Sequence, residues 1–249
     1  MTMGFMRTRL DQLDAAPKPV DGMTLRQAAL VAGLGLLVMC AAAPFADRFV
    51  YPRLVIAGNI EQTIQNIAAH RGLFMAAICA YLVNYVCDMV VAWGLYVLLA
   101  PVNRSLSLLT AWFRLMYTAL ALFATFKLVT VFNLLDTPYD LTLFGSVQLH
   151  AQVKLLLDSF RSDWGMALVL FGIHLALLGM LVYRSGYIPK IIGILLIING
   201  VGWMTNSLGP YLFPGVNFGF LFVTFFAELI FMLWLLARGW KIVEPAGPA

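Results

Sequence analysis

The sequence predicts an all-α, polytopic membrane helix bundle with six transmembrane helices and two short amphipathic interfacial helices in its outer loops. Of its 249 residues, 62% are hydrophobic and only 11% are charged, whereas a soluble domain devotes about a quarter of its residues to charge. The hydrophobic residues also gather into runs near the length of about 20 residues that a helix needs to cross a bilayer. Because so little charge cannot cover a water-exposed surface, these observations exclude a soluble enzyme, a disordered protein and a disulfide scaffold.

Six apolar runs define the expected spanning helices. Residues 191–227 carry no charge, but Gly209-Pro210 and Pro214-Gly215 interrupt them. Paired Gly and Pro punctuate helices, so this stretch is expected to hold two helices. The first run is long enough to span, which argues against its being a cleaved signal peptide. The six expected helices cover residues 27–46, 72–103, 105–135, 164–183, 188–208 and 211–237.

Two outer loops carry apolar residues at helical spacing. Steps of three and four residues place such side chains on one face of a helix. We therefore expect two amphipathic helices on the outer membrane interface, and a lid over the bundle fits the same pattern. The apolar positions are Ile60, Ile64 and Ile67 in the first loop and Leu149, Val153, Leu156, Leu157 and Phe160 in the second.

The placement of Lys and Arg predicts the orientation of the chain. Cytoplasmic segments retain positive residues, and with the N-terminus inside most of the basic residues fall on the inner side. Both termini are therefore expected in the cytoplasm. The chain then divides into a cytoplasmic N-terminal arm (1–24), a six-helix transmembrane domain (25–240) and a cytoplasmic tail (241–249). The inner basic residues are Arg7, Arg9, Lys18, Arg26, Arg104, Arg184, Lys190, Arg238 and Lys241.

Polar side chains inside the expected spans mark the candidate site for a solute or ion, because a polar or charged group in the bilayer is costly unless it is paired or hydrated. Counted from the cytoplasmic ends of their helices, most of them lie about 15–20 Å deep. Five helices thus contribute one polar residue each to a layer near the midplane: Asp88, Arg114, His174, Asn199 and Glu228. Asn84 lies one turn before Asp88 on the same small and polar helix face.

Two pairs are expected within this layer. Asp88 and Arg114 have opposite charges on helices joined by a very short turn, so they are expected to form an ion pair that fixes helix register. His174 and Glu228 are expected to meet as a proton relay or cation site, or as a satisfied interhelical hydrogen bond. Lys127 lies in the outer half of its helix and either extends toward the interface or needs an inward acid, which the sequence does not show at that depth.

No cofactor and no metal site are expected. The three histidines form no HExxH pattern, the three cysteines form no CxxC pair, and Walker, Rossmann and nucleophile-elbow motifs are absent from the sequence. Nucleic acid is not an expected partner, because the basic residues form no patch with interleaved aromatics. The expected partners are the lipid bilayer and a small solute or proton; a protein partner or a homo-oligomer is left open. The isolated glycines are interpreted as helix-packing residues: Gly33, Gly35, Gly193, Gly200 and Gly202.

Two stretches of the chain carry a resemblance to a known family. Residues 101–115 contain a Pro-x-Asn-Arg-Ser turn, and residues 171–193 contain Phe-Gly-x-His followed by Arg-Ser-Gly-x-x-Pro. In these motifs the chain resembles the bacterial multi-pass membrane family known as domain of unknown function 4386, from the first helix to Glu228. The resemblance implies a bacterial inner (cytoplasmic) membrane protein without an established activity, and it transfers no catalytic residue.

Three function classes follow from this reading. The leading hypothesis is a non-enzymatic membrane protein whose polar layer lines a cavity that binds or passes a small solute or proton. The first alternative is a structural or accessory membrane subunit whose polar layer only fixes helix register. The second is a membrane enzyme that acts on a lipid or isoprenoid, which requires a cleft that opens sideways between helices.

Overall fold

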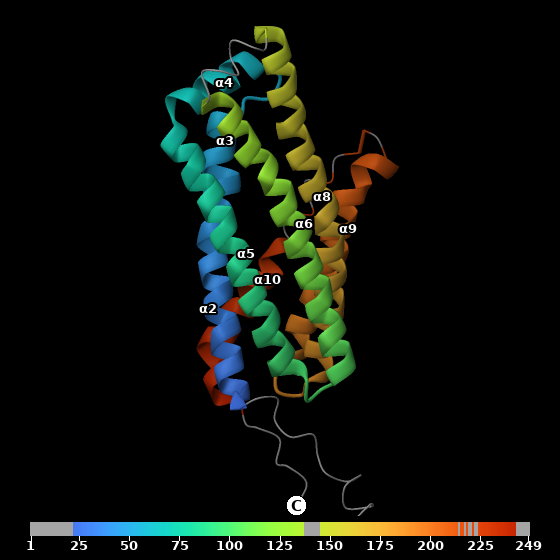
Figure 1. Ribbon diagram of the computed structural model, residues 1–249. Coiled ribbons are helices and arrows are strands. Elements are labelled where there is room, and N and C mark those ends of the chain that lie inside the picture. The colour runs from blue at the N-terminus through green and yellow to red at the C-terminus, as the bar shows by residue number, and fades with distance from the viewer. Residues whose placement is uncertain are drawn as a thin grey trace, which may run out of the picture.

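The computed structural model describes residues 22–136, 145–213, 215–216, 218, 221 and 224–242. Most of the expected N-terminal arm and residues 243–249 of the expected tail lie outside this range. Every regular element of the described residues is a helix (Figure 1). The elements are α2 (Leu25–Pro44), η2 (Phe45–Val50), α3 (Tyr51–Leu54), α4 (Ile60–Ala69), α5 (Arg71–Leu99), α6 (Arg104–Asp136), α8 (Ser146–Arg184), α9 (Lys190–Leu212), α10 (Phe226–Arg238) and η4 (Gly239–Lys241).

Five helical segments of the described residues are long and apolar enough to cross a membrane, by length and composition. The expected count of six is not reached, because α10 has 13 described residues and a span needs about 20. The architecture is therefore that of an all-helical, multi-pass membrane protein. The five segments are Leu25–Leu54, Arg71–Leu99, Arg104–Asp136, Val147–Arg184 and Lys190–Leu212.

The first span is longer than expected and changes geometry at Pro44. It begins with a capping box, in which Thr24 Oγ1 accepts from Gln27 N and Gln27 Oε1 accepts from Thr24 N. Pro44 has no N–H to donate and crowds the preceding turn. The helix widens there into the π-helix η2 and then continues as α3 to Leu54. Single π turns inside helices are frequent at functional sites.

The two outer amphipathic segments differ from the expectation. The first is the separate helix α4, whose Ile67 is buried. The second is not a separate interfacial helix: it is the N-terminal part of the 39-residue helix α8. Its apolar face is covered by protein, since Leu149, Val153 and Phe160 are buried and α8 contacts α4. Helical spacing alone could not tell packing on protein from packing on lipid.

The boundary between the fifth and sixth expected helices was also wrong. The α9 helix passes through Gly209 and Pro210 and ends at Leu212, where Phe213 N donates to Gly209 O at 2.8 Å. Proline is tolerated within apolar membrane helices because neighbouring groups satisfy the freed backbone. The other expected breaker, Pro214, lies outside the described residues.

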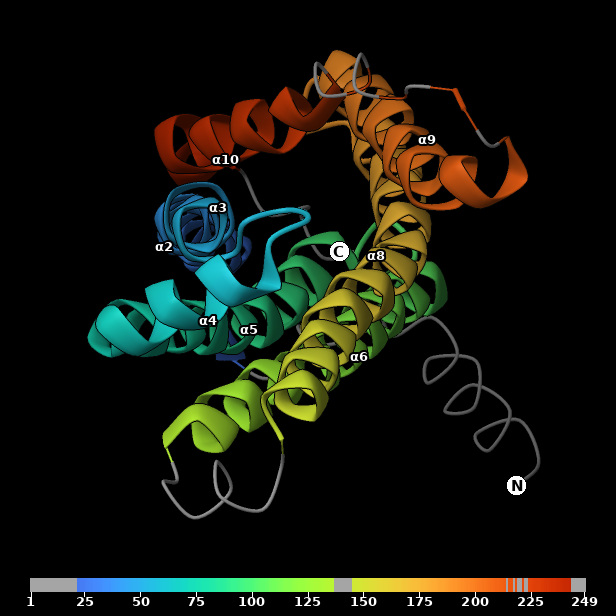
Figure 2. The same ribbon diagram turned by 90° about the horizontal axis from the view of Figure 1, so that it is seen from above.

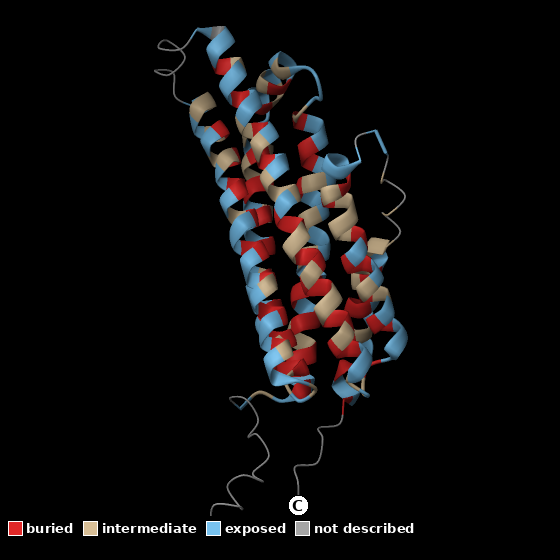
Figure 3. Ribbon diagram, turned by 90° about the vertical axis from the view of Figure 1, so that its right-hand side faces the viewer, coloured by how far each residue is buried: buried red, intermediate tan, exposed pale blue. Residues whose placement is uncertain are grey.

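The helices surround a common interior. In the view from above, the order of neighbours is α2, α5, α6, α8, α9 and α10, and α10 packs back against α2 (Figure 2). Buried residues face this interior and exposed residues face outward (Figure 3). The outer face is apolar, with Val86, Trp112 and Phe123 each more than 60% exposed, whereas Asp88 and Arg114 are at most 1% exposed. Polar groups inside and apolar groups outside are the pattern expected when lipid is the solvent.

Close helix contacts occur at the predicted glycines. A Cβ on Gly200 would lie 2.5 Å from the carbonyl oxygen of Gly172, and one on Gly193 would lie 2.7 Å from that of Gly179. These glycines allow the backbones of α8 and α9 to approach each other closely. The interpretation of Gly33, Gly35, Gly193, Gly200 and Gly202 as packing residues is confirmed, since an added Cβ at each would meet a neighbouring helix or Thr224 at less than ordinary contact distance.

Candidate functional site

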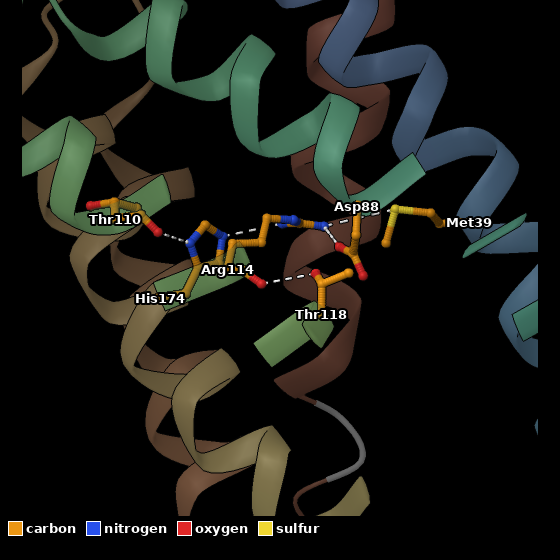
Figure 4. A network of polar contacts seen from close by, with 6 residues as sticks. All are labelled: Met39, Asp88, Thr110, Arg114, Thr118 and His174. Carbon is orange, nitrogen blue, oxygen red and sulfur yellow. Dashed lines mark hydrogen bonds and ion pairs between the residues drawn. The ribbon is translucent and has the colours of Figure 1, made fainter. Parts of the chain in front are cut away.

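A buried chain of polar contacts joins three helices at the centre of the protein (Figure 4). Arg114 Nη2 of α6 lies 2.6 Å from Asp88 Oδ1 of α5, and the two side chains are 1% and 0% exposed. Arg114 Nη1 lies 3.1 Å from His174 Nε2 of α8. His174 Nδ1 lies 2.9 Å from the carbonyl oxygen of Thr110, one turn before Arg114. The ion pair expected between Asp88 and Arg114 is therefore present, and His174 extends it.

The partners of His174 define its protonation state. A guanidinium group can only donate hydrogen bonds and a carbonyl oxygen can only accept them. Nε2 must therefore accept from Arg114, and Nδ1 must carry the proton that is donated to Thr110. His174 is thus assigned as the neutral Nδ1–H tautomer, and the network holds one positive and one negative charge.

Neighbouring side chains contact both the backbone and the guanidinium group of Arg114. Thr118 Oγ1 donates to the Arg114 carbonyl oxygen at 2.8 Å. Arg114 Nη2 also donates weakly to Met39 Sδ at 3.8 Å, and the guanidinium carbon lies 5.5 Å from the centre of the Phe171 ring. The Phe171 ring stacks on His174 with 5.8 Å between centroids. Arginine suits this position because it offers five donors in a rigid fork.

Glu228 is not the partner of His174, contrary to the sequence-based expectation. Both ring nitrogens of His174 are engaged by Arg114 and Thr110. Glu228 instead lies beside Asn199 of α9, whose amide makes no well-aligned hydrogen bond among the described residues. The charges that act on Glu228 are those of Arg114 and Asp88. The expected layer thus divides into a bonded network and a separate Glu228–Asn199 pair.

A cavity of 290 Å³ lies beside the network and is lined by all six helices that surround the interior. Glu228 and Asn84 line it from α10 and α5. Met39 and Phe171 both line the cavity and contact Arg114, so they join the cavity to the ion pair. Small-molecule sites are of this kind, mostly apolar with a few polar groups.

The π-helix η2 supplies the charged groups at one end of the cavity. Asp47 and Arg48 line it there. Asp47 Oδ1 accepts from Arg161 Nη1 at 2.5 Å, and Asp47 Oδ2 lies 3.5 Å from Arg48 Nε. Arg161 also lies over the ring of Tyr51 at 4.2 Å. The wide turn at Pro44 therefore positions a carboxylate that two arginines compensate.

Several residues that line the cavity have polar atoms that are buried and unpaired. Within the described part of the chain, no hydrogen-bond partner is found for the Tyr81 hydroxyl, Asn84 Oδ1, Trp164 Nε1 or Trp203 Nε1. An unsatisfied buried polar group costs about 1–3 kcal/mol. The Arg114 network also keeps unpaired atoms, since Asp88 Oδ2 and Arg114 Nε have no hydrogen-bond partner among the described residues.

Lys127 has an acid that the sequence analysis missed. Its Nζ pairs with Asp163 of α8, and the two side chains are 23% and 42% exposed. Asp163 was counted with the outer loop because α8 was expected to begin at residue 164. Since α8 begins 18 residues earlier, Asp163 lies on the helix at the level of Lys127. This pair belongs to the outer part of the bundle and not to the cavity.

The described residues offer no grouping of three or more His, Cys, Asp or Glu side chains that could share a metal ion. The cavity residues that sequence reasoning missed include seven aromatic ones, among them Tyr81, Tyr85 and Trp203. A signal was present for two of them, because Tyr81 and Tyr85 are spaced four residues apart beside Asn84 and Asp88. No side-chain signal could reveal Thr110, which acts through its backbone carbonyl.

Residues 31–239 match the family described as "Domain of unknown function (DUF4386)". An uncharacterized protein of Archaeoglobus fulgidus is 34% identical over 186 residues, which cover 75% of this chain and 91% of the relative. No solved structure matches the chain. The chain belongs to the DUF4386 family, in agreement with the motifs of its turns.

Proposed function

We propose that this member of the DUF4386 family is a membrane protein that binds a small solute, or passes it or a proton, at the polar cavity between its helices. The supporting observation is the cavity itself: it is bordered by six helices and by Glu228, and it adjoins a buried ion pair. Buried ionisable groups in membrane proteins are usually paired or face a functional pathway. Asp88 and Arg114 are paired with each other, and Glu228 lines the cavity.

A second candidate is an accessory membrane subunit. One observation favours it: Asp88, Arg114, His174 and Thr110 bind one another, as a device that fixes helix register does. The network would suffice for that role without a cavity. The access of solutes to the cavity therefore discriminates between the two candidates.

The proposed topology has six spans with both termini in the cytoplasm and the chain in the cytoplasmic membrane. The start of α2 and the end of α10 meet, since Arg26 Nε donates to the Ile242 carbonyl oxygen at 2.9 Å. This contact supports α10 as a sixth pass. Basic residues at the same end of the bundle, including Arg104 and Lys190, support a cytoplasmic side there. In this topology α4 lies at the outer interface.

Cysteine labelling tests whether solutes reach the cavity. Both thiols are exposed, but Cys40 lines the cavity and Cys79 is not among the lining residues. The change in the rate of Cys40 when the cavity is filled, and not its reaction alone, therefore reports access to the cavity. Two single-cysteine proteins, each carrying one of these thiols, are purified in detergent and treated with charged, water-soluble methanethiosulfonates. Cys40 is expected to react, and the cavity-filling variant Ala43→Trp is expected to slow its reaction at least about tenfold, because Ala43 lines the same space.

The reaction of Cys79 serves as the control and is expected to be equal with and without Ala43→Trp. Solute binding is contradicted if Cys40 stays unmodified by every reagent, or if Ala43→Trp leaves its rate unchanged. Either result would favour the accessory subunit, whose interior needs no solute access.

A further inference from the structure

Among the described residues, Glu228 is the carboxylate lining the cavity for which no ion pair is found. Asp88 and Arg114 cancel each other at 2.6 Å, and His174 is neutral because its Nε2 accepts from Arg114. Glu228 has no ion-pair partner within 4.0 Å among the described residues, and Asn199 beside it is uncharged. An isolated carboxylate inside a membrane protein requires a counter-charge. The counter-charge is either a proton on Glu228 or a cation in the cavity.

The walls of the cavity suit an organic cation. They carry aromatic rings from four helices, and the face of an aromatic ring attracts a cation, with Trp the most effective. An inorganic cation such as Ca²⁺ or Mg²⁺ requires several oxygen ligands, whereas the walls near Glu228 are mainly aromatic and aliphatic. The aromatic residues on these helices are Tyr81 and Tyr85 of α5, Tyr117 of α6, Trp164 and Phe171 of α8, and Trp203 of α9, and Phe225 directly before α10 also lines the cavity.

The size of the cavity limits the ligand. Its volume of 290 Å³ is at the lower end of the range of about 300–1,000 Å³ that is typical of small-molecule sites. A compact amine or quaternary ammonium ion is compatible with this volume, and a whole lipid is not. The Trp203 ring stacks on Phe225 at 4.0 Å, which provides one flat aromatic surface on the α9 and α10 side.

We propose, on the premise that the cavity binds a solute, that its ligand is a small organic cation whose charge Glu228 balances and whose apolar part packs on the aromatic walls. The two arginines beside Asp47 leave one positive charge over at that end of the cavity, but neither forms an ion pair with Glu228. Asp47 is already paired with Arg161 and Arg48, and the side chain of Arg48 is 69% exposed, so water and salt screen its charge.

Proton competition follows from the same charge count. Glu228 balances the ligand only when it is deprotonated, so binding displaces a proton and strengthens as the pH rises. The other carboxylates near the cavity, Asp47 and Asp88, are in ion pairs. The titratable and charged groups around Glu228 are Cys40, Asp47, Arg48, Tyr81, Tyr85, Asp88, Arg114 and Tyr117.

The test compares three probes of similar shape: benzyltrimethylammonium, which cannot lose its charge, neutral phenylacetamide and anionic phenylacetate. Each is added to the purified full-length protein that retains Cys40 as its single cysteine. The readout is protection of Cys40 from the methanethiosulfonate, together with tryptophan fluorescence from Trp164 and Trp203. Only the cation is expected to protect, and its affinity is expected to rise by up to about tenfold per pH unit while Glu228 titrates.

The Glu228→Gln variant removes the charge and nearly keeps the shape. It is expected to weaken protection by benzyltrimethylammonium more than about tenfold and to abolish its pH dependence. Cys40 itself should remain reactive in the absence of probe. Glu228→Asp, which keeps the charge, is expected to retain cation selectivity and serves as the matched control for folding.

The outcomes separate this inference from the proposed function. If Cys40 reacts but phenylacetamide protects it as well as the cation does, or if Glu228→Gln keeps cation protection, the cavity binds solutes and the cation assignment is wrong. If no reagent reaches Cys40, or if Ala43→Trp leaves its rate unchanged, solute binding at the cavity itself is contradicted. If Glu228→Gln does not fold, the preference among the three probes in the protein with Glu228 intact still tests whether the ligand is a cation.

Discussion

The two halves of the polar interior differ in how far they satisfy themselves. On the α5, α6 and α8 side, Asp88, Arg114 and His174 form a chain of contacts that ends on a backbone carbonyl. On the α9 and α10 side, Glu228 and Asn199 lie next to a cavity without an ion partner among the described residues. Each side contains one carboxylate, Asp88 on the first and Glu228 on the second.

Burial of a charged residue in a membrane protein therefore does not by itself indicate function. Two opposite charges that balance each other, as Asp88 and Arg114 do, hold helices in register. A carboxylate left open to a cavity is balanced either by a proton or by a cation from outside the protein. Substitutions on the two sides should therefore separate stability from binding.

The largest loss of stability is expected from Arg114→Ala. It leaves Asp88, which is 0% exposed, as an uncompensated buried charge and removes the donor to His174. Breaking one partner of a buried ion pair costs about 3–5 kcal/mol. The expected result is a lower yield of monodisperse protein and a lower unfolding temperature in detergent.

Two variants show whether this loss comes from the stranded charge. Replacing both partners, Asp88→Leu with Arg114→Met, is expected to recover most of the stability, because an apolar pair of similar volume is often as stable as a buried ion pair. Lys127→Met is the control, since its pair with Asp163 is partly exposed and such pairs contribute about 0–1 kcal/mol. Equal losses of stability in Arg114→Ala and Lys127→Met would mean that the Asp88–Arg114 pair does not hold the helices together.

A smaller loss is expected from His174→Phe. The aromatic shape and the stacking on Phe171 are retained, but Arg114 Nη1 and the Thr110 carbonyl oxygen lose their partner. Unsatisfied buried groups of this kind cost about 1–3 kcal/mol. Thermal unfolding measures the loss, and cation protection of Cys40 should persist. An unchanged unfolding temperature would show that the bonds of His174 contribute nothing to the network.

The charge pattern of the sequence was sufficient to predict the Asp88–Arg114 ion pair, but not the partners of His174. Asp88 and Arg114 were predictable because a short turn and opposite charges leave few alternatives. The partner of His174 was not, because depth along a helix does not give rotation around it, and its second partner is a backbone carbonyl. Helix spacing likewise located the apolar face at Leu149 and Val153, but it could not show that protein packs on this face. The sequence analysis therefore treated α8 as two separate helices and did not place Asp163 beside Lys127.

The smallest effect on stability is expected from Glu228→Gln. The matched substitution Asp88→Asn should differ from it most clearly. Glutamine removes a charge that no described side chain balances, so no ion pair is broken, and the unfolding free energy should change by less than about 1 kcal/mol or rise. Asp88→Asn strands Arg114 instead and should cost several times more. Thermal unfolding of the two variants side by side measures the difference. Comparable losses of stability would mean that Glu228 also fixes helix register. A residue that only binds a cation should not be needed for the stability of the ligand-free protein.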